Sequence, residues 1–237
     1  MISETSFAQS YSSTWRLLAP ATDLFVRKVN SMLREREFAP LNSTILPERR
    51  GFINESAFQF FRIRRQMFNW SRTRNELISM AAEVAKATIC RIERIDPADI
   101  SNPVGVEEDD IVAIAERLQA FFSRVSNGQG FQVQPKFPGC GIIDTCFGDV
   151  RFGDTLYEVK AGDRTFRSMD LRQLLIYAAL SKSAGMAPLR HVGLLNPRTG
   201  VSFFSGLDDL CLEVSGTRSE ELLSEIVRVI SSGDTSR

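Results

Sequence analysis

The chain has 237 residues, of which 43% are hydrophobic and 24% charged, and its 29 basic residues balance 29 acidic ones. These proportions are typical of a globular protein and exclude a disordered or collagen-like chain. No apolar segment reaches the ~18–20 residues that cross a bilayer, and the start, MISETSFAQSYSS, lacks the pattern of a signal peptide. We therefore expect a cytoplasmic protein without membrane contact.

The zero net charge argues at first against a nucleic-acid partner, but the charge is unevenly distributed. Residues 47–74 hold seven arginines and two acids, whereas residues 81–124 hold nine acids and five bases. A basic stretch is thus balanced by an acidic one. The zero net charge is better interpreted as a cancellation between these two stretches.

The first hundred residues predict helices, because apolar residues recur at helical spacing over 24–33 and 77–95. The segment DPADISNPVGVEEDD (96–110) holds two prolines, a glycine and four consecutive acids, which is typical of a linker or a long surface loop. We expect a helical N-terminal region over 1–105 and a second domain over 106–237.

The second region alternates helix and strand signals. The predicted elements are a helix over 111–125, strands over 131–137, 141–152 and 155–161, a helix over 168–182, strands over 190–195 and 201–206, and a helix over 222–230. Gly153-Asp154 predicts a hairpin turn. This order predicts an α/β fold with a mixed central β-sheet flanked by helices.

Charged residues follow one another in the middle strands of this region. Asp144 follows the apolar Gly-Ile-Ile segment, and Glu158 and Lys160 lie two apart, so they share one face of their strand. If Asp144 and Glu158 lie on adjacent strands, their carboxylates repel, and a divalent cation relieves that repulsion. Oxygen ligands favour Mg²⁺ or Mn²⁺.

The following helix carries Gln173 and Tyr177, which are four residues apart and therefore lie on one helix face. An amide and a phenol above a metal site suit the positioning of a phosphate, a base or a catalytic lysine.

Asp144, Glu158-Val159-Lys160 and Gln173-xxx-Tyr177 together resemble the PD-(D/E)xK nuclease superfamily, and the Gln-xxx-Tyr helix resembles its RecB-like branch. The resemblance covers roughly residues 110–206 and implies a restriction-endonuclease-like αβββαβ core. It implies that Asp144, Glu158 and the backbone carbonyl of Val159 bind the metal. Lys160 would activate the attacking water and offset charge on the phosphate.

The resemblance also implies that Gln173 and Tyr177 position Lys160 and the nucleic acid, and that an acid on the preceding helix, Glu116, joins the metal ligands. Ile143 stands where the family has a proline. Asp149 is the rival to Asp144 as a metal ligand, with a solvated bend as its other interpretation.

The cysteines predict reduced thiols, because they form neither a CxxC pair nor a zinc-ligand pattern. Some RecB-like nucleases hold an iron–sulfur cluster with three ligands near the C-terminus. Here Cys211 stands alone, so we expect no iron–sulfur cluster. The chain also lacks a GxxxxGK[ST] motif, so we expect no nucleotide cofactor.

Arginines supply the candidate contacts to nucleic acid. The stretch FQFFRIRRQMFNWSRTR (58–74) interleaves them with aromatic residues, which suits a core-packed amphipathic helix, a nucleic-acid surface with Trp70 stacked on a base, or a docking face for a partner protein. The candidates are Arg62, Arg64, Arg65, Arg72, Arg164, Arg167, Arg172 and Arg198. Arg198 lies at a predicted hairpin tip, where a contact to the nucleic-acid backbone and a solvated turn are the two interpretations.

We therefore expect a Mg²⁺- or Mn²⁺-dependent nuclease that hydrolyses phosphodiester bonds in DNA, with RNA as the alternative substrate. By resemblance it would act in restriction, phage defence or DNA repair, with any ATPase or helicase activity supplied by a partner. The rival hypothesis is a catalytically silent nuclease-fold subunit that binds nucleic acid or assembles a complex.

Overall fold

The computed structural model describes residues 1–42, 44–66, 72–233 and 235, without the side chains of residues 92 and 93. Its helices are α1 (Glu4–Ser10), α2 (Ser12–Leu18), α3 (Thr22–Lys28), η1 (Val29–Leu33), α4 (Pro47–Gln66), α5 (Arg74–Glu93), η2 (Pro97–Asp99), α6 (Val106–Val125), α7 (Ser168–Ser183), α8 (Leu207–Ser215) and α9 (Ser219–Ser232). Its strands are β1 (Glu35–Arg36), β2 (Gln132–Val133), β3 (Lys136–Phe137), β4 (Cys146–Phe147), β5 (Val150–Phe152), β6 (Thr155–Val159), β7 (His191–Asn196) and β8 (Val201–Gly206).

Within the described residues, six strands form one sheet in the order β1-β8-β7-β6-β5-β2, and β3 pairs with β4 separately. β6 and β7 are parallel, and the segment that connects them contains α7. The neighbouring pairs β5–β6 and β7–β8 are antiparallel. A parallel pair requires such a crossover because both strands start at the same edge. The prediction of an α/β fold with a mixed sheet and flanking helices is confirmed.

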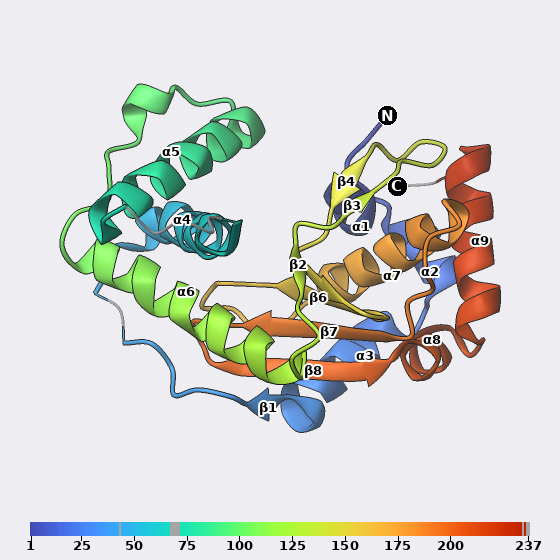
Figure 1. Ribbon diagram of the computed structural model, residues 1–237. Helices are drawn as coiled ribbons and strands as arrows, with labels where there is room; N and C mark the ends of the chain where they lie inside the picture. Colours follow the sequence, from blue (N-terminus) through green and yellow to red (C-terminus); the bar gives the residue numbers. More distant parts are fainter. Residues whose placement is uncertain (43, 67–71, 234, 236–237) are drawn as a thin grey trace.

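The two faces of the sheet are buried by different helices, as alternation along the strands requires. Leu156 and Leu194 belong to a hydrophobic cluster with α7, whereas Tyr157 and Leu195 belong to a cluster with α4, α5 and α6. Figure 1 shows α6 and α7 on different sides of the strands. The sheet therefore separates two apolar cores.

The N-terminal residues divide between these cores. Phe7, Trp15 and Phe25 of α1, α2 and α3 are buried with α7, α8 and α9, and β1 pairs with β8. In contrast, α4 packs on both α5 and α6 at the other end of the molecule (Figure 1). The helices expected over 1–105 thus do not share one core, because the first 36 residues pack against the end of the chain.

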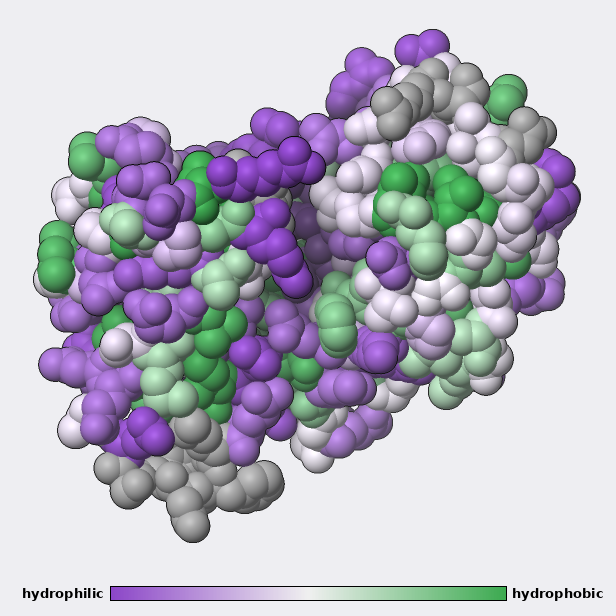
Figure 2. Space-filling model, turned by 90° about the horizontal axis from the view of Figure 1, so that it is seen from above, coloured by the Kyte–Doolittle hydropathy of each residue, from purple (hydrophilic) through white to green (hydrophobic). Residues whose placement is uncertain are grey.

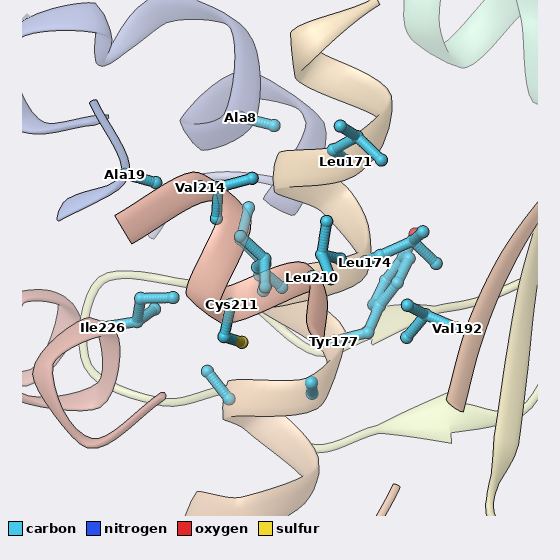
Figure 3. Packing of buried hydrophobic residues seen from close by; sticks show 14 of the residues in the cluster. Ala8, Ala19, Leu171, Leu174, Tyr177, Val192, Leu210, Cys211, Val214 and Ile226 are labelled. Atoms are coloured by element: carbon cyan, nitrogen blue, oxygen red, sulfur yellow. The ribbon is translucent and has the colours of Figure 1, made fainter. Parts of the chain in front are cut away.

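The packing around α7 explains why this helix is so deeply buried. Figure 3 shows Leu174 and Tyr177 of α7 turned toward Val192 of β7, while Leu210 and Cys211 of α8 approach α7 from the other side. The Tyr177 side chain is fully buried. The core therefore fixes the orientation of the helix that carries Gln173 and Tyr177.

Local predictions succeed where the apolar periodicity is strong. The helices expected over 111–125 and 168–182 correspond to α6 and α7, and the Gly153-Asp154 hairpin joins β5 to β6. The strand expected over 141–152 is instead divided into β4 and β5 at Gly148-Asp149. The helix expected over 24–33 begins as α3 and continues as the π-turn η1, leaving Leu24 and Met32 exposed.

Candidate active site

A cleft of about 1020 Å³ lies between α4 and α5 on one side and α1 and α7 on the other. Figure 2 shows it from above as a deep hollow with hydrophilic residues around its mouth. Its floor is the end of β6, and Glu158, Val159 and Lys160 line it. Gln173 and Tyr177 of α7 also reach it.

Glu158 and Lys160 lie on the same face of the chain, as their spacing predicts. Glu158 belongs to β6 and is only 4% exposed, whereas Lys160 follows the last residue of that strand. The Lys160 backbone N–H donates to the Leu195 carbonyl over 2.8 Å, which continues the pairing with β7. The Lys160 ammonium lies 2.8 Å from Glu158 Oε1.

The helix α7 brings its amide and phenol to the same point. Lys160 Nζ donates to Gln173 Oε1 over 2.7 Å. Gln173 Nε2 lies 3.4 Å from the Tyr177 hydroxyl, which donates to the Phe147 carbonyl over 3.2 Å. The four residues Glu158, Lys160, Gln173 and Tyr177 are thus brought together, and Gln173 directly contacts the lysine.

Asp149 is the acid that lies across from Glu158. It precedes β5, and the pairing of Val150 with Tyr157 places Asp149 opposite Glu158 in the antiparallel register. Its Oδ2 accepts a hydrogen bond of 2.6 Å from the Val159 backbone N–H. The residue considered as the rival to Asp144 is therefore the one held beside the ExK segment.

Asp144 takes a different place. It lies before β4, whose partner is β3 and not β6, so the expected placement of Asp144 on the strand adjacent to Glu158 is wrong. Its carboxylate is exposed and accepts from the Thr145 backbone N–H over 2.8 Å. It still lines the cleft. The cause is the break between β4 and β5 at Gly148. The strand that pairs with β6 is β5, so the acid next to it is Asp149, five residues after Asp144.

Burial shifts the ionisation of both central carboxyl groups. It raises the pKa of Asp149 well above its ordinary value, and the charge of Glu158 raises it further. Burial also raises the pKa of Glu158, although the nearby Lys160 ammonium acts in the opposite direction. Two carboxylates in one buried site disfavour simultaneous ionisation. Without a cation, the pair therefore holds a proton more readily than exposed carboxyl groups do.

The lysine and the tyrosine of the site keep their ordinary protonation states. Burial acts to lower the pKa of Lys160, but the charges of Glu158, Asp149 and Asp170 outweigh it, so this pKa is raised. Burial raises the pKa of Tyr177 well above its ordinary value, so the phenol remains a hydrogen-bond donor. Lys160 is therefore a permanent cation beside two carboxyl groups.

The donor set fits a hard divalent cation. Glu158 Oε2 is buried and lacks a hydrogen-bond partner among the described residues, although Oε1 of the same carboxyl group is paired with Lys160. Asp149 and the Val159 backbone lie beside it. In the described part of the chain, there is no group of three or more His, Cys, Asp or Glu side chains that could hold a metal ion. Mg²⁺ tolerates a site with one or two carboxylates because it keeps several of its waters.

Glu116 lies elsewhere, contrary to the expectation that it joins the metal ligands. The apolar face of α6, including Ile114 and Leu118, is buried, and Glu116 is on the exposed face. Among the described residues, the acids that line the cleft beside Asp144, Asp149 and Glu158 are Glu4 of α1 and Glu55 of α4. Sequence reasoning missed both, because neither belongs to a recognisable motif.

The candidate arginines divide between surface and core. Arg198 is 2% exposed, and its Nη1 donates to Asp110 over 2.8 Å, so the expected hairpin-tip contact to nucleic acid is wrong. Arg164 lines the cleft, where its guanidinium donates two hydrogen bonds, of 2.7 and 2.8 Å, to Asp170. Arg172 is half-buried beside Trp15.

The other arginines lie nearer the surface. Arg65 lies 3.8 Å above the Phe131 ring, Arg62 donates to Gln59, and Arg64, Arg72 and Arg167 are exposed. Arg91 of α5 lines the cleft and was missed. The expected stacking role of Trp70 falls outside the described residues.

Comparison with protein-family models and with curated proteins gives no match to this chain. The resemblance to the PD-(D/E)xK nucleases therefore rests on the residues and geometry described above. Among the helices described here, none combines the length and the apolar character that a membrane crossing requires.

Proposed function

We propose that this protein is a divalent-metal-dependent nuclease that hydrolyses phosphodiester bonds, with DNA as its substrate. The observation that carries the proposal is the unpaired, buried Oε2 of Glu158, at the floor of a cleft and beside Asp149 and Lys160. An uncompensated buried carboxylate oxygen is costly, and a bound cation is a means of compensating it. The strand, helix and strand formed by β6, α7 and β7 support a restriction-endonuclease-like core.

In the proposed reaction, Asp149 and Glu158 would hold the cation, which would supply Lewis-acid chemistry for the scissile phosphate and the attacking water. Lys160 offsets the negative charge that develops on the phosphate. Gln173 holds the Lys160 ammonium by its 2.7 Å hydrogen bond, so that the lysine is oriented before the substrate binds.

The test is a cleavage assay on single- and double-stranded DNA and RNA with Mg²⁺, Mn²⁺ or EDTA. We expect cleavage of DNA that requires the metal. Absence of metal-dependent cleavage of either nucleic acid would contradict the proposal, and metal and nucleic-acid binding without cleavage would support a silent nuclease-fold subunit instead.

Substitution of the two candidate aspartates distinguishes their roles. We expect Asp149→Asn to lower kcat about 10³-fold, because losing a metal ligand removes several kcal/mol of transition-state stabilisation at about 1.36 kcal/mol per tenfold. Asp144→Asn, at the exposed wall of the cleft, should cost less than about tenfold by the same arithmetic. Single-turnover rates at saturating Mg²⁺ measure both, and the reverse order would assign the metal to Asp144.

The raised pKa values of Asp149 and Glu158 predict how stability depends on pH. Their contribution is fully present below the unfolded pKa values of about 3.9 and 4.3 and is lost as the pH rises through the folded ones. A cation that binds the ionised pair should reverse this loss. We expect Mn²⁺ to raise the Tm more at pH 8 than at pH 5. At one hundred times the Kd, the gain in the free energy of unfolding is about 2.7 kcal/mol.

Thermal unfolding at both pH values, with MnCl2 or EDTA, measures this effect. Asp144→Asn is the matched control and should keep most of the Mn²⁺ stabilisation. An equal shift at the two pH values would mean that the cation binds elsewhere.

A further inference from the structure

The N-terminal segment forms one wall of the cleft. Ile2 bridges to Ile143, with the Ile2 N–H donating to the Ile142 carbonyl over 2.8 Å and the Asp144 N–H donating to the Ile2 carbonyl over 2.9 Å. Phe7 anchors α1 in the core, where it is fully buried. These contacts hold the side chains between them in fixed positions beside α7.

Two of those side chains continue the hydrogen bonds that begin at Lys160. Gln173 Nε2 donates to Thr5 Oγ1 over 3.1 Å, and Thr5 Oγ1 donates to Glu4 Oε1 over 3.0 Å. The Tyr177 hydroxyl lies 3.4 Å from the same Glu4 oxygen. A connected set of polar groups therefore runs from α1 to the lysine at the floor of the cleft.

Glu4, at the end of this set, determines which group donates and which accepts in each hydrogen bond. A carboxylate has acceptors only, so the hydroxyl proton of Thr5 points to Glu4 and the Thr5 oxygen is left to accept from the amide of Gln173. The NH₂ group of that amide is thereby turned toward Thr5. Its carbonyl oxygen must then face Lys160, as the 2.7 Å contact requires.

We propose that Glu4 and Thr5 are positioning residues that fix the orientation of the Gln173 amide and, through it, the Lys160 ammonium. This inference rests on the nuclease function proposed above for the same site. If Thr5 loses its hydroxyl, the amide of Gln173 is free to turn its NH₂ group toward the cation. Lys160 would then lose an acceptor, and with it the hydrogen bond that orients its ammonium group.

The test compares Thr5→Val, which keeps the shape but removes the hydroxyl, with Thr5→Ser, which restores it. We expect Thr5→Val to lower kcat about tenfold, the usual effect of one lost hydrogen bond, with KM changed less than about twofold. Thr5→Ser should recover most of the rate, and Thr165→Val, at an exposed threonine, is the matched control.

A second measurement is independent of metal and of activity. The side-chain NH₂ group of Gln173 is observed directly in ¹⁵N-resolved NMR spectra of the metal-free protein, with Gln173→Glu for its assignment. We expect these resonances to shift in Thr5→Val, which removes the acceptor of this NH₂ group, and to return toward their wild-type positions in Thr5→Ser. Circular dichroism confirms that each variant is folded.

The outcomes separate the two proposals. An inactive wild type would contradict the nuclease function, and the Gln173 amide resonances would still test the hydrogen-bonded chain. A wild-type rate and unchanged Gln173 amide resonances in folded Thr5→Val would overturn the positioning role of Thr5 and Glu4 while leaving the nuclease function in place. A loss of rate in Thr5→Val that Thr5→Ser does not restore would also overturn it, because the effect would then come from packing.

Discussion

Glu158→Gln should abolish cleavage and leave the metal-free protein at least as stable as the wild type at pH 8. The loss of activity, about 10³-fold, follows from the loss of a metal ligand. The effect on stability follows from the buried site, where burial disfavours the charged forms of Asp149 and Glu158 and the charge of Glu158 further disfavours ionisation of Asp149. Removing one of these two charges removes that repulsion. The carbonyl oxygen of the substituted amide keeps the position from which Glu158 accepts from Lys160.

Lys160→Met is the matched contrast, because it removes a cation from the same buried site. It should also abolish cleavage, but it leaves Asp149 and Glu158 facing each other without the lysine, which makes their ionisation more costly. Leaving a buried charge without its partner costs about 3–5 kcal/mol. We expect a lower Tm at pH 8 that recovers as the pH falls to 5.

Cleavage assays and thermal unfolding at the two pH values test this pair of variants. Equal destabilisation by Glu158→Gln and Lys160→Met would contradict the repulsion inferred for the site. Activity in either variant would contradict the roles proposed for them.

The local part of this site is readable from the sequence because short-range geometry decides it. Glu158 and Lys160 share a face because side chains alternate along an extended chain, and Gln173 and Tyr177 share a face because they are one helical turn apart. The hydrogen bond from Lys160 to Gln173 then requires only that α7 crosses the end of β6. Both pairs share a face even if the predicted ends of the strand and the helix are wrong by one or two residues.

The choice between Asp144 and Asp149 could not be read in the same way. It depends on where the chain reverses between β3 and β5, and the strands there are two or three residues long, too short for a periodic pattern. Glu4 and Thr5 were missed for a different reason. They reach the site by packing against elements about 170 residues away in sequence, and sequence periodicity carries no information about such contacts.

Arg198 shows the same limit of prediction from sequence. It lies in a turn between two strands, where an exposed side chain is expected. Its guanidinium instead reaches back to α4 and α6, where Nη1 donates to Asp110 over 2.8 Å and Nε and Nη2 donate to Asn54 Oδ1 over 3.1 and 2.9 Å. The Asn54 amide donates in turn to the Ala161 carbonyl, next to Lys160. The ion pair therefore ties Arg198 to α6, and Asn54 connects Arg198 and the α4 wall of the cleft to Ala161, next to Lys160.

Arg198→Leu should be among the most destabilising substitutions of the chain. It leaves the Asp110 carboxylate buried without the arginine, at a cost of about 3–5 kcal/mol, and it frees Asn54 from its position. The double variant Arg198→Leu/Asp110→Leu should recover much of that loss, because apolar side chains replace a buried ion pair at little cost. Arg167→Ala, at an exposed arginine, should stay within about 0.5 kcal/mol of the wild type.

Urea unfolding of the wild type, both single variants and the double variant measures these free energies and gives the coupling between Arg198 and Asp110 as a double-mutant cycle. A coupling near zero would mean that the fold holds the two residues independently and that their ion pair does not stabilise the protein. A large coupling predicts a second effect. If the double variant regains stability but not cleavage, the loss must lie in Asn54, because the apolar replacement restores the packing of α4 and α6 but offers no hydrogen bond to hold this amide beside Lys160.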